Sequence, residues 1–143
     1  MKKLLLLVIV TLALGACKKG ESDINPKNPA DVVAGRYKLS SFSLQQGSQR
    51  VSLPGNGQSL NGVAELTKAS QEGYVNLTLT VNNNEVVGTS DNVTLEVRKT
   101  SEAYGLFDGS DQYADVDGNN IIFSLSGTDS NNQQVELSFV GKK

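Results

Sequence analysis

The stretch Val75-Asn76-Leu77-Thr78-Leu79-Thr80-Val81 places an apolar side chain at every second position and a polar one between them. Successive side chains of a β-strand point to opposite faces, so such a strand buries one face and exposes the other to water. This alternation is typical of antiparallel sheets, in which one side is often solvated. The stretch therefore predicts an antiparallel strand whose core residues are Val75, Leu77, Leu79 and Val81.

Three more segments repeat the pattern, and clusters of Asn, Asp and Gly separate them. We count about eight short strands, roughly ten residues apart, and no convincing amphipathic helix. The sequence therefore predicts an all-β fold, a small antiparallel up-and-down barrel, with an immunoglobulin-like β-sandwich as the alternative. The apolar residues of the three segments are Val93, Leu95 and Val97; Ile121, Phe123 and Leu125; and Val135, Leu137 and Phe139.

The first strand, residues 35–44, changes phase. Tyr37 and Leu39 share one parity, whereas Phe42 and Leu44 share the other. A one-residue slip turns side chains to the opposite face, so we predict a β-bulge or sharp bend at Ser40-Ser41. A single helical turn at residues 29–34 is predicted to precede this strand.

Near the start of the chain, Lys2-Lys3 precedes a largely apolar run that ends at Leu14-Gly15-Ala16-Cys17. The run of about eleven residues spans roughly 16 Å as a helix, against a hydrocarbon core of about 30 Å, so it suits a cleaved segment. It resembles a bacterial lipoprotein signal peptide with its lipobox. The resemblance implies cleavage before Cys17 and attachment of diacylglycerol and fatty-acyl chains such as palmitate. A plain signal peptide with a chance cysteine is the alternative.

We therefore predict three parts: a signal peptide over residues 1–16, a lipidated N-terminus and flexible stalk over 17–30, and a β domain over 31–143. The stalk is polar, contains Pro26 and Pro29, and lacks the apolar residues needed for a core. Two acyl chains would hold the protein stably at a membrane. The expected location is the bacterial cell envelope, at the outer membrane, on its periplasmic side or at the cell surface.

The composition excludes several kinds of chemistry. There is no histidine and only one cysteine, which removes Ser-His-Asp and Cys-His catalysis, most zinc or copper sites, and disulfides. The chain has 13 basic and 15 acidic side chains, and 11 against 15 without Lys2 and Lys3, so no basic face for nucleic acid is indicated. We expect a monomer that is not an enzyme and has no cofactor, no metal and no nucleic-acid partner.

The segment from Asp31 to Leu39 resembles the opening of lipocalin-like domains, in which a helical turn leads to Gly-x-Trp and the first barrel strand. Here the motif is Gly35-Arg36-Tyr37, with tyrosine in place of the tryptophan that plugs the closed end. The resemblance implies a barrel that binds a small apolar or amphipathic ligand. The predicted lining residues are Tyr37, Leu79, Leu95, Phe123, Leu137 and Phe139.

Small eight-stranded barrels either are filled by side chains or hold one ligand. An open pocket of about 300 Å³ or more would favour a ligand carrier. A filled barrel or a sandwich would favour an interaction module that presents its sheet or loops to a protein or glycan. A third and weaker alternative is an enzyme that uses carboxylates, for which Glu65, Glu85, Glu96 and Glu136 are the available residues.

The stretch from Tyr104 to Asn119 is rich in aspartate and aromatic residues. Asp115, Asp117 and Asn119 form a fragment of a calcium-loop pattern, but Asp117-Gly118-Asn119-Asn120 also fits a hairpin turn. The three aromatic residues either pack inward or lie at the mouth of a pocket. They are Tyr104, Phe107 and Tyr113.

Overall fold

The computed structural model describes residues 28–55, 57–83 and 87–143. The predicted signal peptide and most of the predicted stalk, including Leu14, Gly15, Ala16 and Cys17, lie outside the described residues. Within the described ranges, no helix has the length and apolar content needed to cross a membrane.

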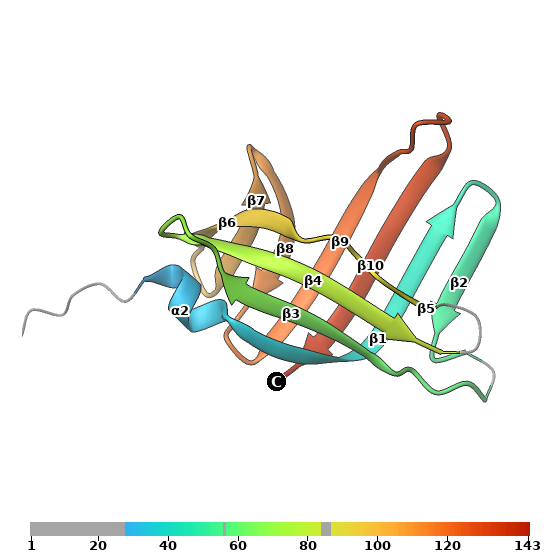
Figure 1. Cartoon of the computed structure of the whole chain (residues 1–143), viewed down its shortest axis with the longest axis horizontal. Coiled ribbons are helices and arrows are strands. Elements are labelled where there is room, and N and C mark those ends of the chain that lie inside the picture. The colour runs from blue at the N-terminus through green and yellow to red at the C-terminus, as the bar shows by residue number, and fades with distance from the viewer. Residues whose placement is uncertain (1–27, 56, 84–86) are drawn as a thin grey trace, which may run out of the picture.

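The described chain forms ten strands in one antiparallel sheet and one short helix, so the predicted all-β fold is confirmed (Figure 1). The elements are α2 (Pro29–Val33), β1 (Gly35–Gln46), β2 (Gln49–Leu53), β3 (Gly62–Lys68), β4 (Tyr74–Asn82), β5 (Val87–Thr89), β6 (Val93–Lys99), β7 (Tyr104–Asp108), β8 (Asp111–Val116), β9 (Asn120–Thr128) and β10 (Gln134–Lys142).

Eight of the strands close into a barrel. Their order is β1-β3-β4-β6-β7-β8-β9-β10, and β10 pairs with β1 along Lys38–Gln46. Each barrel strand therefore has two neighbours, and the predicted up-and-down barrel is confirmed in place of the sandwich. The two remaining strands are extensions: β2 pairs with the second half of β1, and β5 pairs with the end of β4.

The predicted core faces are largely confirmed. On β4, Val75, Leu77, Leu79 and Val81 are all buried, and the inward residues of β6, β9 and β10 follow the expected parity. The exception is Val93 at the start of β6, which is 48% exposed. Val93 lies where the pairing of β4 with β6 ends.

The predicted bulge in the first strand is confirmed at Ser40. Leu39 pairs with Gly141 and Ser41 pairs with Val140, so Ser40 has no opposite residue on β10. The Ser40 hydroxyl donates a hydrogen bond to the Val140 carbonyl at 3.2 Å. Because the extra residue shifts the parity, Leu39 and Phe42 are both buried although they lie three residues apart. The bulge thus keeps both halves of β1 facing the same core.

One end of the barrel is closed by α2 and Tyr37. The Asn28 side chain accepts a hydrogen bond from the Ala30 amide at 3.0 Å and caps the helix, and α2 packs against β3 and β6. Val33 and Tyr37 are fully buried, and the Tyr37 hydroxyl donates to the Val33 carbonyl at 2.6 Å. Burial and, secondarily, the negative charge of Asp117 raise the pKa of Tyr37 to about 12.

Replacing Tyr37 tests this plug. Tyr37→Phe leaves the buried Val33 carbonyl without its donor, so we expect the free energy of unfolding to fall by about 1–3 kcal/mol, as measured by urea denaturation. A raised pKa means that the stabilisation is complete below the ordinary value of 10.0 and is lost as the pH rises toward about 12. The difference between wild type and variant should therefore shrink between pH 10 and pH 12, and a constant difference would contradict the assignment.

Candidate functional site

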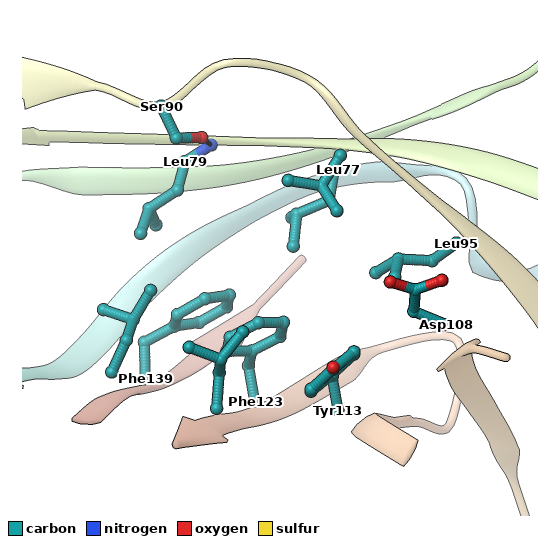
Figure 2. A pocket seen from close by; sticks show the side chains of 11 residues that line it. Leu77, Leu79, Ser90, Leu95, Asp108, Tyr113, Phe123 and Phe139 are labelled. Atoms are coloured by element: carbon teal, nitrogen blue, oxygen red, sulfur yellow. Dashed lines mark hydrogen bonds between the residues drawn. The ribbon is translucent and has the colours of Figure 1, made fainter. Parts of the chain in front are cut away.

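A cavity of about 170 Å³ lies in the other half of the barrel. Leu77 and Leu79 of β4 and Leu95 of β6 form one wall, and Phe123 of β9 and Phe139 of β10 face them (Figure 2). Nine of the eleven lining residues are apolar or aromatic, and the two others are Ser90 and Asp108. The cavity is therefore suited to an apolar group.

Five of the six residues predicted to line a ligand site border this cavity. They share it because all lie on the inward parity of their strands and on the same half of the barrel. The sixth, Tyr37, is in the core at the closed end and does not border the cavity. The five are Leu79, Leu95, Phe123, Leu137 and Phe139.

Aromatic rings form the most rigid part of the wall. Phe123 and Phe139 are opposite each other on β9 and β10, and their rings stack with centroids 4.7 Å apart and planes 6° apart. Tyr113 of β8 extends the row, with its ring 6.3 Å from that of Phe123. Figure 2 shows the three rings side by side across the three strands. They offer a flat, polarizable surface to a ligand.

The cavity exists because neighbouring strands separate in this half of the barrel. Pairing of β4 with β6 ends at Leu77 and Val93, pairing of β1 with β3 ends at Lys38, and β8 pairs with β9 only from Ala114 to Val116. Beyond these points the hairpins β1–β2 and β9–β10 extend away from the end that α2 closes (Figure 1). We call this flared end the mouth.

A strip of half-buried apolar side chains continues from the cavity along the extended hairpins. Val51 of β2, Leu44 of β1, Leu137 of β10 and Leu125 of β9 are consecutive in register across four strands. All four pack against the core but are not fully covered. Two of them, Leu125 and Leu137, also border the cavity. The strip therefore joins the cavity to the outer end of the mouth.

Tyr113 reaches the cavity because β8 contains a second bulge. Leu106 pairs with Ala114 and Phe107 pairs with Gln112, which leaves Tyr113 as the extra residue. Of Tyr104, Phe107 and Tyr113, only Tyr113 borders the cavity. The Arg98 guanidinium lies 4.5 Å from the Phe107 ring centroid, and Tyr104 packs against the core.

Sequence reasoning missed two polar residues of the wall. Ser90 continues the pairing of β4, because its amide donates to the Leu79 carbonyl at 2.8 Å and its hydroxyl accepts from the Leu79 amide at 2.9 Å. Asp108 is the last residue of β7 and lies two positions after the buried Leu106. That spacing is a period-two signal, but the surrounding aspartates and glycines obscured it.

The glutamates considered for catalysis do not line the cavity. Glu96 forms an ion pair with Arg98 on the opposite parity from Leu95, and Glu136 accepts from the Gln134 side chain at 2.9 Å. Glu65 is in β3 and does not border the cavity, and Glu85 lies outside the described residues.

The acidic stretch forms the expected hairpin turn at Asp117. One Asp117 carboxylate oxygen accepts from the amides of Asn119 and Asn120 at 2.8 and 2.7 Å, and the other accepts from the Asn120 side chain at 2.8 Å. The Asn120 side chain and then these amides lower the pKa of Asp117. In the described part of the chain, no group of three or more acidic, histidine or cysteine side chains is placed to hold a metal ion.

Comparison with protein-family models, with curated proteins and with solved structures found no match to this chain.

The Asp117 turn leads to a prediction about calcium. Because backbone and side-chain N–H groups already occupy the Asp117 carboxylate, we expect neither added calcium nor a chelator to change the thermal denaturation midpoint. An ion that bound the folded state would raise the midpoint with its concentration. A rise with calcium that the chelator reverses would show that the stretch binds the ion.

Proposed function

We propose that this protein is a non-catalytic, monomeric bacterial lipoprotein whose barrel binds a small apolar or amphipathic molecule. The observation that carries the proposal is the apolar cavity of about 170 Å³, which lies at the flared end of the barrel. Its walls are the inward faces of the barrel strands, which would pack against one another if the strands did not separate at this end. The lipid anchor is proposed from the resemblance of residues 1–17 to a lipoprotein signal, with diacylated Cys17 as the attachment point at the outer membrane.

The size of the cavity limits the ligand. It is smaller than the 300 Å³ or so typical of sites that enclose a drug-sized molecule. An apolar cavity of about 150 Å³ in another protein holds benzene. The part of the ligand that the cavity encloses is therefore one ring or a short chain end. A longer molecule would extend along the strip formed by Val51, Leu44, Leu137 and Leu125.

Burial of the apolar part would supply most of the binding free energy. Each CH₂ group removed from water contributes about 0.8 kcal/mol, so a six-carbon end contributes about 5 kcal/mol before the costs of association are subtracted. The parallel pair Phe123 and Phe139 adds a flat contact for a ring. The cavity alone would thus bind weakly, and contacts in the mouth would have to add affinity.

The alternative function is an interaction module. The observation in its favour is the outer edge of β2, Gln49–Leu53, which pairs with no strand of the described chain, since β1 is the one strand that β2 pairs with there. An open edge can accept an extended peptide as an additional strand. A cavity too small for a whole ligand is compatible with this function as well.

Native mass spectrometry of the protein purified from its own envelope separates the two functions. A co-purifying small molecule at one per chain, retained in repeated preparations, would support ligand binding. Repeated recovery of the bare protein, with no small molecule bound, would count against ligand binding and in favour of the interaction module.

A cavity-filling substitution gives a direct prediction with benzene as the probe. Benzene should raise the thermal denaturation midpoint of the wild type by an amount that grows with the benzene concentration. Leu137→Phe, which places extra volume in the cavity, should abolish this rise. Val140→Phe is the matched control, because Val140 lies on the same strand, is 37% exposed and faces outward. Equal responses of Leu137→Phe and wild type would exclude binding in this cavity.

A further inference from the structure

The cavity wall is apolar except at one charged residue, Asp108. Figure 2 shows its carboxylate between Leu95 and Tyr113, at the side of the cavity formed by β6, β7 and β8. The other polar residue, Ser90, already accepts a hydrogen bond from the Leu79 amide. A ligand that fills the cavity therefore meets one negative group.

The fold fixes Asp108 in this place. Leu106 and Asp108 share the inward parity of β7, and Asp108 pairs with Asp111 across the hairpin to β8. Arg98 donates to the Gly109 carbonyl at 2.8 Å, which holds the hairpin beside β6. Gly109 has φ of +59°, a conformation that glycine adopts at little cost. The carboxylate is thus attached to an ordered turn.

The Asp108 carboxylate has no hydrogen-bond or ion-pair partner among the described residues. The nearest arginine along the sheet, Arg98, is engaged by Glu96, by the Gly109 carbonyl and by the Phe107 ring. A carboxylate beside an apolar wall loses part of its hydration when a ligand enters. A ligand that supplies no partner would leave that cost uncompensated, and an anionic ligand would add repulsion.

Acidic side chains predominate in the turns around the mouth. The connection from β5 to β6 (residues 90–92) and the turns of the hairpins β7–β8 (108–111) and β9–β10 (129–133), all at the mouth, carry Asp91, Asp108, Asp111 and Asp129 and no lysine or arginine. Asp129 is occupied by the amides of its own loop and by Gln46, whereas Asp108 borders the cavity. Arg98 of β6 lies beside the β7–β8 turn, where it donates to the Gly109 carbonyl, and its charge is paired with that of Glu96. The acidic turns therefore favour a cationic ligand over a fatty-acid carboxylate.

We propose that the ligand joins an apolar ring or short chain to a cationic nitrogen, and that Asp108 binds this nitrogen at the mouth while the apolar part fills the cavity. This inference rests on the proposed binding of a ligand in the cavity, and it adds the chemical class. The ion pair is partly exposed to water, so it selects among ligands of equal apolar size more than it adds affinity.

Three probes with the same ring and different heads test the proposal on the full-length protein by NMR titration: benzylamine, benzyl alcohol and benzoate at neutral pH. We expect benzylamine, as its ammonium form, to bind about three- to tenfold more tightly than benzyl alcohol, with benzoate weakest. The preference for the amine should shrink as the ionic strength is raised from about 0.05 to 0.5 M.

Asp108→Asn should remove the preference for benzylamine and leave the affinity for benzyl alcohol within about twofold of wild type. Asp111→Asn is the matched control, because it removes a charge from the same hairpin at a residue that does not border the cavity. It should retain the preference. The salt series on the wild-type protein is a second measurement that requires no variant.

The outcomes distinguish the two proposals. If benzyl alcohol binds the cavity as tightly as benzylamine, or if Asp108→Asn keeps the preference, the cationic ligand class is wrong and the proposed cavity binding stands. If none of the three probes binds, and the probes change the spectrum of Leu137→Phe no less than that of the wild type, cavity binding itself is wrong.

Discussion

Closure of β1 onto β10 is the constraint on which the rest of the structure depends. The two strands pair from Lys38 to Gln46, and this pairing removes the free edges that a meander of eight strands would otherwise expose. It requires β1 to bend, because its first half pairs with β3 and its second half with β2. The bulge at Ser40 allows the bend and keeps Leu39 and Phe42 in one core.

The same bend produces the cavity. Once β1 leaves β3 after Lys38, the two sides of the barrel diverge, and the pairing of β4 with β6 and of β8 with β9 is also short. The closed end is held by Tyr37 and its hydrogen bond to the Val33 carbonyl, so the divergence affects one end only. The barrel therefore has a packed core at one end and a cavity at the other. The size of the cavity reflects how far the strands separate.

Local pattern predicts the strands of this fold, and long-range register decides the site. The parities of β4, β6, β9 and β10, the bulge at Ser40 and the turn of α2 follow from residue spacing within a few positions, and all could be predicted. The inward positions of Tyr113 and Asp108 could not, because a bulge opposite Leu106 sets the position of Tyr113 and a short strand of five residues gives little periodicity. Parity alone does not show which end of the barrel a residue occupies, so it does not separate Tyr37 at the closed end from the residues that border the cavity.

A side-chain-filled barrel would not need the polar group that this one places at its mouth. Leucine at position 108 would continue the apolar face of Leu106, whereas aspartate places a charged, exposed side chain at the border of the cavity. Hairpins need Asp and Gly at their turns, but Asp117 and Asp129 serve that purpose through hydrogen bonds to their own loops. The Asp108 carboxylate makes no such bond in the described chain and is exposed to solvent. The proposed selection among apolar molecules by charge would give this carboxylate a role, because such selection requires one charged group beside an apolar surface.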